Sequence, residues 1–128
     1  MRERLVYICS PLRGDYETNA ENARVYCRVI MRYGPDDVIP LAPHIYFPQF
    51  LYDTDTEERK LGMDAGIVLL DKCEELWAFG LENPSEGMKA EIEHAKERGI
   101  PIRDGFKVLE DNIIRIMKGE RNGQKRKH

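Results

Sequence analysis

The sequence predicts an α/β fold, a doubly wound three-layer α/β/α sandwich built on a parallel sheet of four or five strands. Short apolar runs alternate with longer segments of helical periodicity. Turn signals separate the two kinds of segment, and the connections are short. Such alternation implies right-handed crossovers and a Rossmann-like or flavodoxin-like sheet, whose strand order these patterns leave open.

The composition is that of one globular domain. Of the 128 residues, 41% are hydrophobic and 34% charged, and the net charge of −3 favours neither nucleic acid nor a membrane as partner. No apolar run has the length of a membrane span, and the N-terminal stretch is too short for a signal peptide. We therefore expect a cytoplasmic protein. The three cysteines lack paired spacing and are expected as small core residues, with no metal site and no cofactor: Cys9, Cys27 and Cys73.

The first half of the chain carries two strand signals and two helix signals. Residues 5–9 predict a buried strand, and residues 37–43 a second one shortened by its prolines. Thr18 with Glu21, and Thr54 with Glu57, have capping-box spacing. Residues 44–53 are expected as an aromatic-rich loop. The apolar faces expected to point inward are Ala20, Ala23, Cys27, Ile30 and Met31 in the first helix, and Leu61, Ala65, Val68, Leu69 and Cys73 in the second.

The second half continues the alternation. Residues 75–80 predict a third strand with Trp77 in the core, followed by a helix over residues 85–98 and a strand near residues 100–102. Residues 107–119 predict an amphipathic helix with Leu109, Ile113, Ile116 and Met117 inward. The domain is expected to span residues 1–118. Residues 119–128 lack apolar side chains and are expected to be a disordered basic tail, with contact to an acidic partner as the alternative.

Two loops are candidate ligand-binding sites, because ligands of such sheets bind beyond the C-terminal ends of the strands. Ser10, Arg13 and Gly14 follow the first strand and suit an anion such as phosphate, with a turn bearing a solvated arginine as the alternative. Ser85 follows the third strand and is expected to cap a helix whose N-terminus attracts anions, or to be a plain cap. The chain lacks the fingerprint motifs of dinucleotide-binding and P-loop proteins.

Carboxylates at the borders of two apolar helix faces are candidates for chemistry. Glu91 lies about 40° from the buried position of Ala95 and one turn after Gly87, which has no side chain. Asp64 has a similar border position in the preceding helix. Such a pair fits acid/base or nucleophilic catalysis, although periodicity alone favours ordinary salt bridges. His44 is expected to make a loop hydrogen bond, and Tyr46 either stacks on a base or packs under its loop.

Together these residues resemble a known family. The stretches "VYICSPLRGD", "ELWAFG" and "SEGMKAEIEHA", with the helix that contains Asp64, are similar to the nucleoside 2-deoxyribosyltransferase superfamily, including its deoxynucleoside 5′-monophosphate N-glycosidases. The form with "APHIYFPQFL" resembles a short bacterial and phage group. The similarity spans about residues 5–102, and its sharpest element is S-x-G-x-x-x-E, formed by Ser85, Gly87 and Glu91.

The resemblance implies catalytic roles. Glu91 matches the nucleophile that attacks the anomeric C1′ carbon, expels the nucleobase and leaves a covalent deoxyribosyl-enzyme. Tyr7 matches the tyrosine that orients this glutamate. Asp64 is the candidate for the aspartate that protonates or holds the leaving base, although Gly66 is nearer that position when residues are counted back from Glu91.

The resemblance also implies a substrate and a reaction. Ser10, Arg13, Gly14 and Ser85 match loops that surround a 5′-phosphate in the monophosphate branch. We therefore expect cleavage or exchange of the N-glycosidic bond of a 2′-deoxynucleoside or its 5′-monophosphate, with hydrolysis favoured. A base-exchanging transferase and a nucleotide-binding module without turnover are the alternatives. A homodimer or higher homo-oligomer is implied as well.

Overall fold

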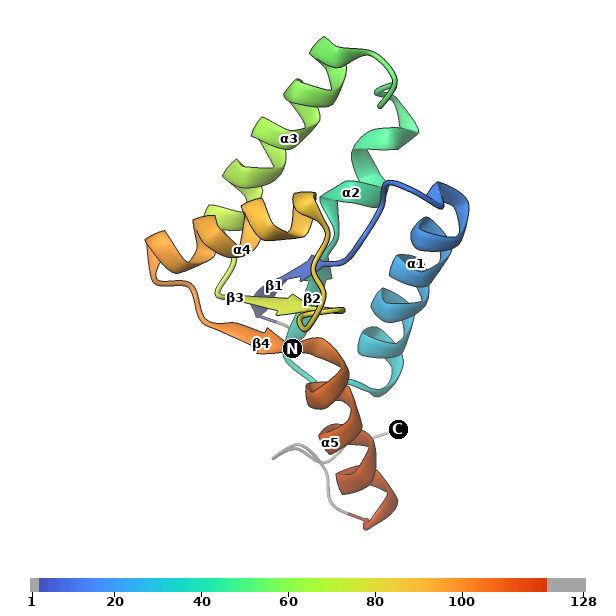
Figure 1. The fold of residues 1–128 in the computed structure, drawn as a ribbon. Coiled ribbons are helices and arrows are strands. Elements are labelled where there is room, and N and C mark those ends of the chain that lie inside the picture. The colour runs from blue at the N-terminus through green and yellow to red at the C-terminus, as the bar shows by residue number, and fades with distance from the viewer. Residues whose placement is uncertain (1–2, 120–128) are drawn as a thin grey trace.

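The computed structural model describes residues 3–119 and contains one parallel sheet of four strands in the order β2-β1-β3-β4. The strands are β1 (Arg4–Cys9), β2 (Val38–Leu41), β3 (Glu75–Ala78) and β4 (Ile102–Asp104). The predicted α/β class and parallel sheet are confirmed, with four strands (Figure 1). Because the chain leaves β1 for β2 on one side and returns to β3 on the other, the strand order reverses between β1 and β3. A crevice for ligands is expected beyond the C-terminal ends of those two strands.

Helices cover both faces of the sheet, giving the three predicted layers (Figure 1). Helices α1 (Tyr16–Tyr33) and α5 (Gly105–Met117) pack on one face, and α3 (Thr56–Asp71) and α4 (Glu86–Arg98) on the other. The short helix α2 (Pro43–Tyr46) and a 3-10 turn (Phe47–Gln49) lie between β2 and α3. Among the helices within residues 3–119, none combines the length and the apolar character that crossing a bilayer requires.

Alternation along β1 divides the core between the two faces. Val6 and Ile8 belong to the apolar cluster under α1 and α5, whereas Tyr7 and Cys9 belong to the cluster under α3 and α4. The predicted core position of Trp77 is confirmed, since it is fully buried on the α1 and α5 side. The period of two residues therefore places the Tyr7 hydroxyl in the same layer as helix α4.

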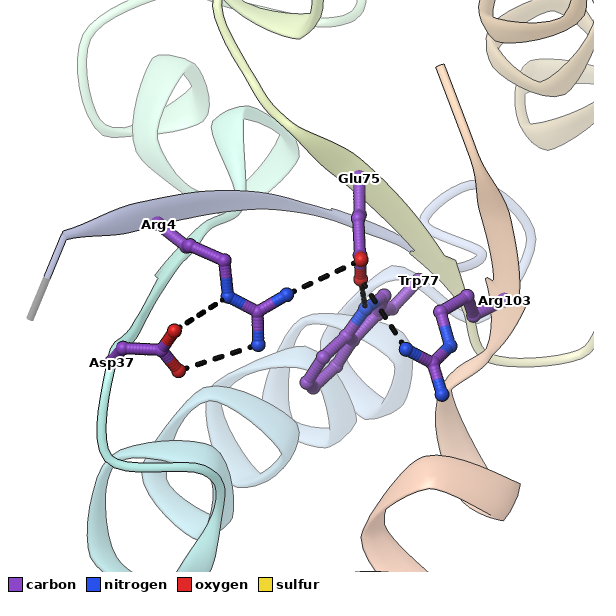
Figure 2. A network of polar contacts seen from close by, with 5 residues as sticks. All are labelled: Arg4, Asp37, Glu75, Trp77 and Arg103. Carbon is purple, nitrogen blue, oxygen red and sulfur yellow. Dashed lines mark hydrogen bonds and ion pairs between the residues drawn. The ribbon is translucent and has the colours of Figure 1, made fainter. Parts of the chain in front are cut away.

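A polar network fastens the beginnings of the strands together (Figure 2). The Arg4 guanidinium donates to Asp37 at 2.8 Å and to Glu75 at 3.2 Å, and the Trp77 indole donates to Glu75 at 2.8 Å. Arg103 on β4 lies 3.9 Å from the same Glu75 carboxylate. These contacts connect three strands and the approach to β2 at the end of the sheet opposite the C-terminal crevice.

Two predicted helix caps are wrong. Helix α1 is capped by Asp15, which accepts from the Thr18 amide, and α3 by Asp55, which accepts from the amides of Glu57 and Glu58. A carboxylate satisfies free amides and also opposes the positive end of the helix dipole, so each helix is capped by an aspartate, three residues before Thr18 in α1 and one residue after Thr54 in α3. The predicted cap of α4 by Ser85 is confirmed by its bond from the Met88 amide.

The expected loop at residues 44–53 is also wrong in part, because this segment contains most of α2 and the 3-10 turn.

The inward faces of three helices differ from expectation. In α3 the buried positions are Gly66 and Leu70, which lets the helix approach the sheet closely. The predicted inward residues that are instead exposed are Met31 in α1, Leu61 and Val68 in α3, and Ile113 and Met117 in α5. The predicted tail lies outside the described residues except for Gly119.

The packing of α5 against Phe79 can be tested by substitution at Gly105. A Cβ built there would lie 2.4 Å from the Phe79 ring, which is buried and stacked on Tyr26 at 4.2 Å. Gly105→Ala should therefore lower the free energy of unfolding by about 1–3 kcal/mol. A Cβ built at Gly62 would lie 3.5 Å from its nearest neighbour, which is ordinary van der Waals contact. Gly62→Ala should therefore be neutral or stabilising by about 1 kcal/mol. Urea unfolding of both variants tests this, and equal effects would contradict the packing described.

Candidate active site

A cavity of about 620 Å³ opens beyond the C-terminal ends of β1 and β3, where the strand order predicts a crevice. Its size is typical of small-ligand sites. Four segments form its walls: β1 with the loop that follows it, the α2 region, helix α3, and the first turns of α4. Nine of the ten predicted site residues line it, and they come from all four segments: Tyr7, Ser10, Arg13, Gly14, His44, Asp64, Ser85, Gly87 and Glu91.

The central contact of the cavity joins Glu91 to Tyr7. The Tyr7 hydroxyl donates to Glu91 Oε2 at 2.7 Å, and Tyr7 itself is 1% exposed. Helix α4 brings Glu91 to this point because Ser85 caps the helix six residues earlier and Ile92 and Ala95 fix its buried face. The carboxylate therefore faces the cavity from α4 while its partner rises from the middle of the sheet.

Burial changes the acidity of this pair. Loss of solvent raises the pKa of Glu91 to about 7, and the hydrogen bonds from Tyr7 and Cys9 offset only part of that rise. The pKa of Tyr7 is raised well above its ordinary value by burial and by the adjacent carboxylate, so its hydroxyl remains a donor. Near neutral pH Glu91 is then divided between its acid and its carboxylate, and the ionised form is poorly solvated.

Cys9 and Gly66 complete the surroundings of the pair. The Cys9 thiol lies 3.9 Å from the Met88 carbonyl oxygen and, being buried, has a strongly raised pKa that keeps it protonated. A Cβ at Gly66 would lie 3.5 Å from the Tyr7 hydroxyl and 3.9 Å from Pro43, so α3 passes directly over the tyrosine. This position, which the resemblance associates with an aspartate, carries no side chain.

A second polar pair lies in the same cavity. Ser10 Oγ and His44 Nε2 share a hydrogen bond of 2.8 Å, which satisfies the predicted loop hydrogen bond of the histidine. Burial lowers the pKa of His44 to about 4, so the imidazole is neutral at physiological pH. This neutral pair lines the same cavity as Tyr7. It offers uncharged donors and acceptors to a ligand.

The loop after β1 and the start of α4 face each other across the cavity. Arg13 is exposed, and Gly14 has a φ of 95°, a conformation that glycine adopts without strain. Ser85 accepts from the Met88 amide at 3.3 Å. At Gly87 a Cβ would meet nothing within 4 Å, so space is open above the first turn of α4. The structure thus brings together the four residues predicted to surround an anion.

Two predicted site residues are less well placed. Asp64 lines the cavity, but its side chain is 65% exposed and pairs with Lys60 at 2.8 Å. This matches the ordinary salt bridge that periodicity favoured. Tyr46 is 58% exposed and is not among the residues that line the cavity; its ring packs against Phe47 and Phe50 instead. The expectation that Tyr46 stacks on a base therefore has no geometric support.

Several residues of the cavity were missed by sequence reasoning. Cys9, expected as a core residue, is buried and is not among the residues that line the cavity, although it shares a face of β1 with Tyr7. Asp53 and Arg59 line the cavity mouth and contact each other at 3.7 Å. Asp53 lies in the irregular segment between α2 and α3, where no periodicity marks it, and the helical pattern of α3 does not distinguish Arg59 from a solvated arginine. Within residues 3–119, no group of three or more histidine, cysteine, aspartate or glutamate side chains is arranged to hold a metal ion.

The comparisons with known proteins place the site inside a family without a known role. The model of a family described as a domain of unknown function, DUF7768, matches residues 4–105. This match spans all four strands and every residue of the cavity named above. No curated protein matches the chain.

The raised pKa of Glu91 predicts that the stability of the protein depends on pH. The ordinary glutamate pKa of 4.5 rises to about 7 in the folded protein, so folding retains a proton that the unfolded chain releases between these values. The free energy of unfolding should therefore fall as pH rises through this range, by up to roughly 3 kcal/mol. Glu91→Gln should remove that dependence and be more stable than wild type at pH 8.

Urea unfolding at several pH values between 5 and 8 measures this effect, after allowing for other titrating groups by comparison with a control. Glu93→Gln is the matched control, because Glu93 is exposed on the same helix. A Glu91→Gln variant whose stability changes with pH in the same way as wild type would contradict a buried, proton-retaining Glu91.

Proposed function

We propose that this chain, which belongs to the DUF7768 family of domains of unknown function, is an enzyme that cleaves or exchanges the N-glycosidic bond of a 2′-deoxynucleoside or its 5′-monophosphate. Glu91 is the proposed nucleophile, and hydrolysis is the favoured outcome. The observation that carries the proposal is the contact between Glu91 and Tyr7, at 2.7 Å, on the wall of a cavity of about 620 Å³.

The environment of Glu91 suits attack on a sugar carbon. A 2-deoxy sugar lacks the electron-withdrawing 2′-hydroxyl, so it reaches an oxocarbenium-like transition state readily. A poorly solvated carboxylate opposite that developing positive charge stabilises it strongly, and bond formation removes the buried negative charge. Tyr7 holds one oxygen, Oε2, which leaves Oε1 available to face C1′.

The proposed reaction has two steps. In the first, a Glu91 oxygen forms a bond to C1′ while the C1′–N bond breaks, and the bonding electrons leave with the base, which takes up a proton. In the second, water attacks C1′ and displaces the carboxylate. The products are the free base and 2-deoxyribose or its 5-phosphate, with the water proton released to solvent. In base exchange a second base replaces the water.

Two groups in the cavity are proposed to act on the leaving base, one as the proton source and one through hydrogen bonds. Asp64 is the candidate from the resemblance, and its exposure at the mouth permits exchange with solvent. The Ser10 and His44 pair is neutral and lines the same cavity as Tyr7, so it suits hydrogen bonds to the base or to a sugar hydroxyl. Arg13 and the N-terminus of α4 support a substrate with a 5′-phosphate, which is the reason for favouring hydrolysis of the monophosphate.

A homodimer or higher homo-oligomer belongs to the same proposal. Apolar side chains on α3 that the sequence predicted to be inward, Leu61 and Val68, are exposed, as is Met63 beside the cavity. Leu61 and Val68 are seven residues apart and share one face of α3, and their exposure supports contact with a second copy of the chain.

The alternative from another functional class is a nucleotide-binding module without turnover. It would use Arg13 and Ser85 but would have no need for a nucleophile. The half-buried position of Glu91 on the cavity wall favours the enzyme, because carboxyl groups with a strongly raised pKa in a cavity are typical of catalytic sites.

The proposal predicts release of free base. Incubation with each deoxynucleoside and its 5′-monophosphate, with and without an acceptor base, should yield free base detectable by chromatography. Glu91→Ala should lower the rate at least about a thousandfold, because the covalent step loses its nucleophile. Glu93→Gln should retain the wild-type rate. Binding of nucleotide without base release by any preparation would support the module instead.

Removal of the Tyr7 hydroxyl should change the pH dependence of base release. The attacking form of Glu91 is the carboxylate, so the rate should rise with pH through about 7. The bond from Tyr7 lowers the pKa of Glu91, so Tyr7→Phe should move that rise upward by about one pH unit. Tyr26→Phe, on the other face of the sheet, is the control. An unchanged midpoint in Tyr7→Phe would argue against Glu91 as the titrating nucleophile.

A further inference from the structure

The mouth of the cavity holds two arginines that share one carboxylate. Arg13 belongs to the loop after β1, and Arg59 to the first turn of α3. Arg13 Nε lies 3.5 Å from one Asp53 oxygen, and Arg59 Nε lies 3.7 Å from the other. All three residues line the cavity. Two guanidinium groups from distant parts of the sequence therefore converge on one position at its edge.

These contacts leave the arginines available for another anion. Charge-assisted hydrogen bonds between arginine and carboxylate are typically about 2.7–2.9 Å long, and both contacts to Asp53 are longer than that. Among the described residues, neither guanidinium donates a hydrogen bond to a protein acceptor. Asp53 thus holds the two cations near each other without using their donors.

The remaining charges of the cavity have other partners. Asp64 pairs with Lys60 and Glu86 with Lys89, while Glu58 accepts from the Tyr52 amide at 2.7 Å. Arg13 and Arg59 are the only arginine or lysine side chains among the described residues that line the cavity. An anionic ligand that enters this largely acidic cavity would therefore be attracted to this one position.

We propose that Arg13 and Arg59 form an anion subsite, that Asp53 is its internal counter-ion, and that the ligand is the dianion of a phosphate monoester. A dianion attracts both guanidinium groups more strongly than a single carboxylate does, and its three oxygens accept from both planar forks at once. Asp53 disfavours weaker anions because they must compete with it. The identification of that monoester as a deoxynucleoside 5′-phosphate rests on the proposed function, whereas the subsite itself does not.

Binding of inorganic phosphate, measured by calorimetry, tests the subsite without any turnover. Arg59→Gln should weaken phosphate binding by about tenfold or more, because charge-assisted hydrogen bonds are lost. Asp53→Asn should tighten it by about fivefold, because the competing carboxylate is removed. The controls are Arg28→Gln, an exposed arginine on α1, and Glu57→Gln, an exposed acid beside the subsite that does not line the cavity. Both should stay within about twofold of wild type.

A second arm identifies the source of the phosphate. In Glu91→Gln protein, Arg59→Gln should weaken binding of a deoxynucleoside 5′-monophosphate by a similar factor and leave binding of the matching deoxynucleoside unchanged. Selective binding of inorganic phosphate over the nucleotide would assign the subsite to free phosphate and overturn the monoester. Thermal unfolding of each variant confirms that it is folded before its affinity is compared.

The outcomes separate this inference from the proposed function. If Arg59→Gln binds phosphate as Arg28→Gln does, or if Asp53→Asn weakens binding instead of tightening it, the subsite with its counter-ion is wrong, even where base release occurs. If the phosphate pattern is found and no deoxynucleotide releases its base, the subsite stands and the glycosidase proposal fails.

Discussion

A carboxyl group enclosed by protein and held by a tyrosine hydroxyl is the constraint on which the cavity depends. An acid removed from water is costly in its ionised form unless it is hydrogen-bonded, and the Tyr7 hydroxyl supplies that bond to Glu91 at 2.7 Å. Three features of the fold make the contact possible. Alternation along β1 directs Tyr7 toward α4, the Ser85 cap fixes the start of α4, and α3 covers the tyrosine at Gly66, where a Cβ would lie 3.5 Å from its hydroxyl. Each is a local consequence of sequence, but only the folded sheet combines them.

The two ends of the sheet use charge differently. At the beginnings of the strands, Arg4, Asp37, Glu75 and Trp77 satisfy one another, and their contacts join separate strands (Figure 2). At the C-terminal ends, charged groups face a cavity and the glycines leave space beside them. The network at the beginnings of the strands stabilises the sheet, because its members bond to one another. The arginines at the mouth of the cavity and Glu91 on its wall are suited to binding a ligand. The division agrees with the general placement of sites in open α/β sheets.

Much of this arrangement could be predicted from the sequence. The parallel sheet, the crossover helices and the Ser85 cap follow from apolar runs and capping chemistry, and these act locally. The caps predicted at Thr18 and Thr54 were wrong because a nearby aspartate starts each helix at a different residue, and spacing alone does not rank such alternatives. The inward positions assigned to Leu61 and Met117 were wrong because an apolar residue at helical spacing is equally able to face outward. Glycines, which pattern analysis treats as weak helix positions, mark the true contact face of α3.

The candidate site could be predicted from the sequence only in part, because some of its contacts depend on the folded arrangement and not on a local pattern. The pairing of Glu91 with Tyr7 was implied by the resemblance and not by periodicity, and the structure brings the two residues into contact. The shared carboxylate of Asp53, by contrast, depends on the path of the irregular segment before α3, which no periodicity encodes.

The most direct test of the proposed mechanism is mass spectrometry of protein quenched during reaction with a deoxynucleoside 5′-monophosphate. The account predicts one added deoxyribose phosphate, located by peptide mapping on Glu91 and absent from Glu91→Gln. An adduct on another residue, or base release by Glu91→Gln at the wild-type rate, would contradict it.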